Sequence, residues 1–264
     1  MSTFTSRAII LKRITYLDYD LIIDFLTYEK GKVSAIAKNA LKSKKRFAGI
    51  LEPFVCLDAV FAGPGRKNGM PVLKEALVKN PFAGIRLDIK KTAYAAYWSE
   101  MVNRWMEEDG TGSMPVFQLL YHVLDGLDRA GIAQETLHIL FQVRFMTLAG
   151  MAPRLDSCGI CKKKIDQLAG PELYFDVAKG GIVCHTCGLD GYHSNRTAFS
   201  KGTVKQLLWM QTSQLEKAAR VQLSGAARNG CKKALEAFVL YHLSSELKSL
   251  DVLRSICGRV KGGA

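Results

Sequence analysis

The chain has 264 residues, of which 48% are hydrophobic and 23% charged, and its formal net charge is +13. This composition supplies a globular core, and no apolar run approaches the ~18 residues of a membrane span. The N-terminus lacks the charged, apolar and small-residue order of a secretory signal. We therefore expect a cytoplasmic protein whose seven cysteines are metal ligands or buried thiols and not disulfides.

The positive charge is concentrated at the two ends of the chain. Residues 1–80 carry a net charge of +7 and residues 158–264 one of +8, whereas residues 81–157 carry −2. A polyanion could contact both ends and avoid the middle, so this distribution favours nucleic acid as a partner. The alternative is that the charge only keeps the protein soluble.

Five short β-strands are predicted in the first eighty residues, where β-branched and aromatic residues are separated by turn signals. The expected strands are Arg7–Lys12, Leu21–Tyr28, Val33–Ala37, Phe54–Phe61 and Pro71–Val78. Five strands in this length fit a small closed barrel such as an OB-fold. An SH3-like barrel or a half-sandwich would fit the same pattern.

After Pro81 the apolar residues recur at helical spacing. Three stripes are expected to form helices, and they run from Tyr94 to Trp105, from Phe117 to Leu127 and from Leu137 to Leu148. Beyond a cysteine-containing insert, Ser200 is expected to cap a helix that carries Val204, and a last long helix carries Leu235 to Leu247. We expect the helices on either side of the insert to pack together.

The insert holds two C-x-x-C pairs separated by twenty-two residues. The candidate metal ligands are Cys158, Cys161, Cys184 and Cys187. A two-residue spacer lets both thiolates of a pair reach one ion, and two pairs complete a tetrahedron around zinc. Since four thiolates leave no open coordination position, this single Zn²⁺ would hold structure and not activate water.

A hairpin within Tyr174–Val183 is expected to bring the two cysteine pairs together, as in a zinc ribbon. His185 and His193 are close enough to substitute as ligands, but their spacing favours solvated side chains. The run Lys162–Lys164 could contact phosphate or could offset the thiolate charge. The remaining cysteines, Cys56, Cys231 and Cys257, are expected to be buried apolar residues.

A dense run of cations lies between the third and fourth expected strands, and no acidic residue interrupts the chain from Lys30 to Ile50. The candidate DNA-binding residues are Lys38, Lys42, Lys44, Lys45 and Arg46. We expect them to contact phosphates without base specificity, with Ser43 as a donor and Phe47 as a stacking face for a base. The alternative is a solvated loop with Phe47 in the core.

The chain offers little for catalysis. Asp18, Asp20 and Asp24 are close in sequence and could suggest a metal-dependent nuclease, but strand alternation places Asp20 and Asp24 on one face only. Neither a Walker-type phosphate loop nor a nucleophile and base set is present. We therefore expect a protein that is not an enzyme.

Several stretches together resemble the bacterial RecO family of recombination mediators in the RecF pathway. The matching stretches are Ala8–Lys12, Tyr16–Ile22, Phe25–Gly31, Gly49–Phe54, Leu148–Leu155 before the first cysteine pair, and Phe175 with Gly180–Val183 before the second. They cover the order of all modules along the chain. The family has members without the cysteines, and this chain is similar to those that carry them.

The resemblance implies an α+β protein in which a five-stranded OB-fold β-barrel precedes an α-helical domain with an inserted four-cysteine zinc-binding module. The expected segments are the OB-fold in residues 1–80, the helical domain in 81–155 and 193–256, the zinc module in 156–192 and a tail in 257–264.

The resemblance also implies function. It implies binding to single- and double-stranded DNA, annealing of complementary strands, partnership with RecR and a nucleoid-associated location. It further implies recognition of the acidic C-terminal tail of single-strand-binding protein, which lets RecA load. Such a tail, which ends in an apolar residue, would need an apolar pocket with a cation. Arg144 lies on an apolar stripe, but the position favours an arginine that extends to solvent or pairs with an internal carboxylate, so it is not among the expected site residues.

A scaffold provides the alternative function. In this hypothesis a zinc-containing protein links repair partners and touches DNA only incidentally. The aromatic helix with Trp98 and Trp105 would then be a protein-binding face, although core packing would explain the same residues.

Overall fold

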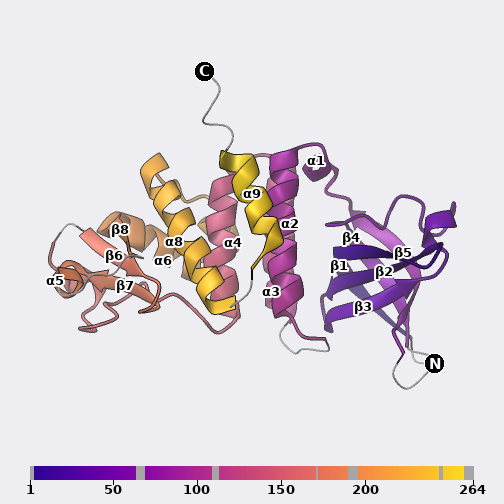
Figure 1. Cartoon of the computed structure of the whole chain (residues 1–264), viewed down its shortest axis with the longest axis horizontal. Helices are drawn as coiled ribbons and strands as arrows, with labels where there is room; N and C mark the ends of the chain where they lie inside the picture. The colour runs from indigo at the N-terminus through magenta and orange to yellow at the C-terminus, as the bar shows by residue number, and fades with distance from the viewer. Residues whose placement is uncertain are drawn as a thin grey trace. The chain divides into compact units, whose positions relative to one another are not determined.

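The computed structural model describes residues 3–63, 69–108, 113–170, 172–189, 196–243 and 246–258. The chain divides into two compact units, residues 1–129 with 247–264, and residues 130–246. Figure 1 shows the strands of the first unit in indigo and purple and the small sheet of the second in orange. His193 and the end of the expected tail, residues 259–264, lie outside the described residues.

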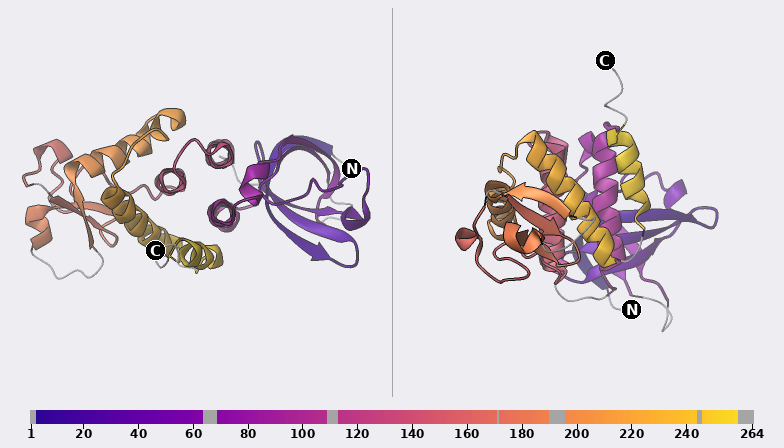
Figure 2. Two further views of the ribbon diagram at one scale, coloured as in Figure 1. Left: turned by 90° about the horizontal axis from the view of Figure 1, so that it is seen from above. Right: turned by 60° about the vertical axis from the view of Figure 1, so that its left-hand side comes forward.

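Five strands of the first unit close into a barrel (Figures 1 and 2). They are β1 (Thr3–Tyr16), β2 (Asp20–Thr27), β3 (Gly31–Ala37), β4 (Cys56–Ala62) and β5 (Val72–Asn80). Their order is β1-β2-β3-β5-β4, with all neighbours antiparallel except β3 and β5. This is the closed five-stranded arrangement of an OB-fold, so the predicted fold class is confirmed.

Alternating side chains of the strands fill the barrel. Phe25 on β2 pairs with Val33 on β3, and both point into the core. Phe25 also meets Phe61 of β4 edge to face at a centroid distance of 5.2 Å. Burying a side chain of this size contributes roughly 1.5–3 kcal/mol, so the interior-facing positions determine the register of the strands.

Four described helices complete the first unit. They are α1 (Ala83–Arg86), α2 (Ile89–Trp105), α3 (Ser113–Arg129) and α9 (Lys248–Gly258). The Asp88 carboxylate begins α2 by accepting the backbone N–H groups of Lys90 and Lys91. Helix α2 packs against β1 and α9, with Trp98 fully buried. The first two helical stripes are therefore confirmed.

The end of the chain differs from the expectation of one long last helix. Helix α8 (Gly225–Leu243) ends before Leu247, and α9 is a separate helix that belongs to the first unit. Leu250 and Leu253, three positions apart, are both buried on α9, which packs against α2. One apolar run thus serves two different cores, which helical periodicity alone cannot distinguish.

The second unit is built on α4 (Gln134–Leu148), α6 (Lys201–Thr212), the short α7 (Leu215–Ala218) and α8. Helix α4 packs against α6 and α8, as expected for helices on either side of the insert. Ser200 caps α6 by accepting the N–H of Thr203 at 3.1 Å. Leu148 is 43% exposed, so the buried stripe of α4 ends earlier than predicted.

A three-stranded sheet with the order β7-β6-β8 lies in the second unit. Its strands are β6 (Glu172–Asp176), β7 (Gly181–Cys184) and β8 (Arg196–Ser200), and the β6–β7 pair confirms the expected hairpin. Strand β8 was not predicted; Asp176 and Arg196 hold it to β6 through an ion pair of 3.0 Å. The remaining elements are η1 (Ala40–Lys42), η2 (Ile165–Gln167) and α5 (His185–Leu189). None of the described helices is long and apolar enough to cross a membrane.

Candidate metal centre and nucleic-acid interface

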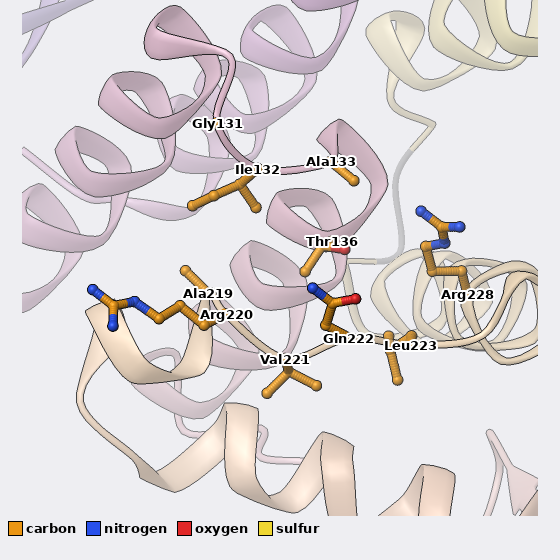
Figure 3. A pocket seen from close by; sticks show the side chains of 10 residues that line it. All are labelled: Gly131, Ile132, Ala133, Thr136, Ala219, Arg220, Val221, Gln222, Leu223 and Arg228. Atoms are coloured by element: carbon orange, nitrogen blue, oxygen red, sulfur yellow. The ribbon is translucent and has the colours of Figure 1, made fainter.

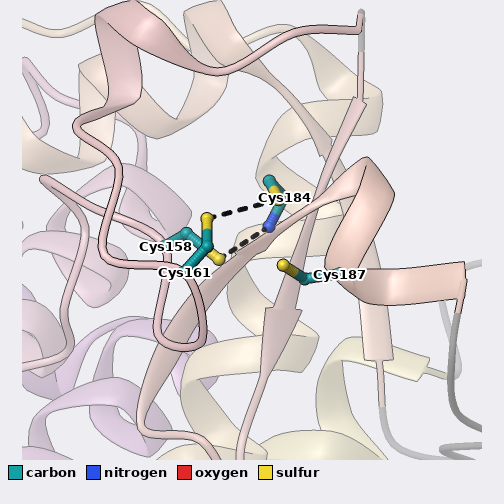
Figure 4. A group of neighbouring side chains, drawn as sticks. All are labelled: Cys158, Cys161, Cys184 and Cys187. Carbon is teal, nitrogen blue, oxygen red and sulfur yellow. Dashed lines mark hydrogen bonds between the residues drawn. The ribbon is translucent and has the colours of Figure 1, made fainter.

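The four cysteines of the insert converge, as Figure 4 shows. Cys158 and Cys161 lie in the loop before η2, Cys184 ends β7 and Cys187 lies in α5. Their Sγ atoms all lie within 4.8 Å of one another, and those of Cys161 and Cys184 are 3.9 Å apart. The expected ligand set is therefore brought together in space, by a loop on one side and a hairpin with a short helix on the other.

Backbone contacts position the first cysteine pair against the second. The Cys158 Sγ accepts the N–H of Ile160 at 3.4 Å and that of Cys184 at 3.3 Å. The N–H of Gly159 donates to the carbonyl of Ile182 at 2.7 Å, which ties the loop to β7. A Cβ on Gly188, just after the second pair, would lie 2.5 Å from the Tyr174 ring, so only glycine fits.

Thiol acidity in the cluster is unequal. Burial alone would raise the pKa of Cys158, but the N–H donors of Cys184 and Ile160 lower it to about 6. The pKa of Cys187 is raised to about 12, first by its contact with Cys184 and then by burial. Four thiolates this close repel one another, so full ionisation of the cluster requires a cation.

These distances fit a tetrahedral metal ion with sulfur ligands. A Zn–S bond of about 2.3 Å gives a tetrahedron whose sulfur atoms are about 3.8 Å apart. The separation of 3.9 Å between Cys161 and Cys184 matches that edge. The ring of His185 stacks on Tyr174 at a centroid distance of 6.2 Å, and no imidazole joins the four-thiol group among the described residues.

The lysines beside the first cysteine pair have mixed surroundings. Lys164 forms a 2.6 Å ion pair with Asp156, and Lys162 donates to the carbonyl of Gly159. Lys163 is exposed. Of the other cysteines, Cys56 and Cys231 are fully buried as expected, but Cys257 is only half-buried and contacts the Tyr94 hydroxyl at 3.7 Å.

The cation run between β3 and β4, residues 38–46, is termed the basic loop. Its candidate DNA-binding side chains are all exposed, namely Lys38, Lys42, Lys44, Lys45 and Arg46. Within the described part of the chain none of the five forms an ion pair with a carboxylate. The basic loop therefore presents five charges that no acidic side chain of the described residues neutralises.

Ser43 of the basic loop and Phe47 just after it stabilise the fold. Ser43 Oγ accepts the N–H groups of Arg46 and Phe47 at 3.1 and 3.0 Å and thereby shapes the turn. Phe47 is 2% exposed and belongs to the barrel core. The expected stacking of a base on Phe47 is therefore wrong, because a buried ring has no face open to a base. Its burial stabilises the barrel instead. Arg46 covers the ring from outside at 4.3 Å.

The acidic residues of β2 are engaged within the fold. Asp20 accepts the N–H of Asn39 at 2.7 Å. Asp24 accepts the hydroxyl of Ser34 at 2.8 Å and the amide of Asn103 at 3.1 Å. Among the described residues, these carboxylates are not part of any group that could hold a metal ion.

A pocket of the second unit, which no sequence pattern indicated, has a volume of about 460 Å³ (Figure 3). Its walls come from residues 131–136, where α4 begins, and from residues 219–228, which lead from α7 into α8, and they include apolar Ile132 and Leu223. Arg220 and Arg228 also line it, and neither has a hydrogen bond or ion pair from its side chain within the described residues. Arg144 lies elsewhere and donates to the carbonyl of Met210 at 2.5 Å.

Comparisons with known proteins agree with the resemblance seen in the sequence. The family described as Recombination protein O N terminal matches residues 1–82, and that described as Recombination protein O C terminal matches residues 86–251. The chain is 55% identical to the DNA repair protein RecO of Desulfosudis oleivorans over 97% of its own length and 99% of that protein. It is 41% identical to the RecO of Desulfatibacillum aliphaticivorans, over 97% and 98% of the two chains. The chain therefore belongs to the RecO family of DNA repair proteins.

Proposed function

We propose that the protein is a recombination mediator that binds single- and double-stranded DNA and anneals complementary strands. With RecR it helps to load RecA onto DNA coated by single-strand-binding protein. The observation that carries this proposal is the basic loop, where five exposed cations have no carboxylate partner within the described residues. The protein acts in the cytoplasm beside the nucleoid.

Annealing is first a problem of charge. Two complementary strands repel each other, and a surface that neutralises their phosphates lets the bases sample pairing. The side chains of Lys44 and Lys45 are exposed, and contacts from such cations to phosphates do not depend on base sequence. Phosphate contacts of this kind suit a protein that must accept any sequence.

The cysteine cluster has a structural part in this proposal. Cys158, Cys161, Cys184 and Cys187 would hold one Zn²⁺, whose chemistry here is to crosslink the loop before η2 to the β6–β7 hairpin. Four sulfur ligands leave no position for water, so the protein would be no metalloenzyme. We propose that it binds and positions DNA without catalysing a reaction on it.

The pocket at the start of α4 is our candidate receptor for the tail of single-strand-binding protein. That tail is acidic and ends in an apolar residue with a free carboxylate. Ile132 and Leu223 offer an apolar surface, and Arg220 and Arg228 offer charge that no described carboxylate neutralises. Charge and apolar character are thus complementary between tail and pocket.

The experiment for this function measures the annealing of two complementary labelled strands coated with single-strand-binding protein. We expect the purified protein to accelerate annealing when the coating protein has its tail. Acceleration should fall when the tail is deleted, and also for an Arg220→Glu, Arg228→Glu variant. Equal annealing on both coatings would refute tail recognition. The same assay on naked strands tests annealing itself, and no annealing there would refute the proposed mediator function. A parallel incubation with Mg²⁺ should yield no cleavage products.

A further inference from the structure

The end of the β1–β2 hairpin carries an unusual group of exposed apolar side chains. Of the sixteen large hydrophobic residues that are exposed in the described chain, five lie on this hairpin or on η1 beside it. This group, termed the hairpin patch, consists of Ile14, Tyr16, Leu17, Tyr19 and Leu41. Exposed apolar groups that gather in one place mark interaction sites more often than single ones do.

Strand alternation places part of the patch on the outside of the barrel. Leu21 and Ile23 of β2 belong to the barrel core, and their partners on β1 are Thr15 and Arg13. Paired residues on neighbouring strands share a face of the sheet, so Thr15 and Arg13 lie on the core-facing side. The residues on either side of Thr15, Ile14 and Tyr16, therefore point outward. Tyr16, which pairs with Asp20, is consequently an outward-facing ring at the very end of the hairpin, and it is 45% exposed.

The hairpin patch and the basic loop meet at η1, because Leu41 belongs to both. The N–H of Leu41 donates to the carbonyl of Tyr19 at 3.0 Å, which ties η1 to the hairpin turn. The Nζ of Lys42 lies 3.2 Å from the centroid of the Tyr19 ring. A cation–π contact of this kind holds the ring beside a phosphate-binding charge while 40% of Tyr19 remains exposed.

We propose that Tyr16 and Tyr19 are base-stacking residues for single-stranded DNA whose phosphates lie on the basic loop. Single-strand sites combine a cationic track with aromatic side chains, since every base has a face that can stack. Phe47 cannot fill this role because it is buried, whereas both tyrosines are exposed and Tyr19 lies against Lys42 of the basic loop. This inference rests on the proposed DNA binding and names the residues that contact bases.

The test compares two oligonucleotides of equal length, one of thymidines and one with abasic sugars in place of every nucleoside. Both have the same phosphates, so only base contacts distinguish them. We expect Tyr16→Leu and Tyr19→Leu each to weaken thymidine-oligonucleotide binding about tenfold. Affinity for the abasic strand and the salt dependence of binding should stay unchanged. Tyr16→Phe and Tyr19→Phe should retain affinity because they keep the ring.

A matched control is Tyr241→Leu, which removes an exposed tyrosine from α8. It should leave both affinities unchanged, and melting curves should show that all variants fold. Unchanged thymidine-oligonucleotide binding by the Tyr16 and Tyr19 variants would overturn the stacking role and leave the proposed function standing. An equal loss on the abasic strand would overturn it too. No binding of either strand by the wild-type protein would overturn both proposals.

Discussion

Replacing Lys42, Lys44, Lys45 and Arg46 together by glutamine removes four positive charges from the basic loop. Glutamine keeps part of each side-chain stem, so Phe47 stays covered where Arg46 now lies over its ring. None of the four cations is paired with a described carboxylate, so no buried partner is orphaned. The variant should therefore fold like the wild type and differ in its binding of DNA.

The expected effect follows from counterion release. Each phosphate contact on a single strand contributes about 0.7 to the slope of log K against log salt concentration. Removing four contacts should flatten the slope by about 2.8. Across a fourfold rise in salt, from about 50 to about 200 mM, the wild type should lose about 50-fold more affinity than the variant.

Fluorescence anisotropy of a labelled oligonucleotide over a salt series measures both slopes. The control variant replaces four exposed lysines of the second unit by glutamine, so that its net charge changes equally. The control residues are Lys163, Lys179, Lys217 and Lys233. The control should keep a slope closer to that of the wild type. An unchanged slope in the basic-loop variant would refute the assignment of phosphate contacts to this loop.

Three further predictions concern the second unit. Metal analysis should find one zinc ion per chain, and Cys187→Ser should lower both the metal content and the melting temperature. Gly181→Ala should destabilise the protein by about 2 kcal/mol in urea unfolding, because its Cβ would lie 2.2 Å from the Arg154 carbonyl; no loss would contradict this packing. Burial lowers the pKa of His138 from its ordinary value of 6.5, although Glu236 opposes the shift. Below that pH the imidazole is protonated more readily in the unfolded chain than in the folded one. The free energy of unfolding should thus decrease as the pH falls below about 6.5, and His138→Gln should remove this dependence.

Local patterns in the sequence were sufficient for much of the fold. The closed barrel could be expected because short strands with alternating burial and turn signals suit it. The two C-x-x-C pairs predicted the metal cluster, since that spacing carries its own geometry. Ser200 was recognisable as a cap because its function depends only on the next few residues.

Other features depend on contacts that no local pattern contains. The burial of Phe47 follows from its place at the barrel core, and the residues just before it in the sequence are cations and a serine. The separation of α8 from α9 depends on which core receives Leu250. The pocket beside Arg220 forms from segments that are far apart in the sequence, 131–136 and 219–228. Exposure of Tyr16 and Tyr19 likewise became visible only once the register of β1 and β2 was known.

Cations on a small barrel are proposed to bring two DNA strands together without catalysing a reaction on them. The rate constant for annealing complementary naked strands at low salt tests this role most directly, with wild-type protein, the basic-loop variant and the matched control variant. We predict that the wild type and the control accelerate annealing and that the basic-loop variant does not. A rate constant for the basic-loop variant equal to that of the wild type would contradict this role of the cations. So would a wild-type protein that does not accelerate annealing.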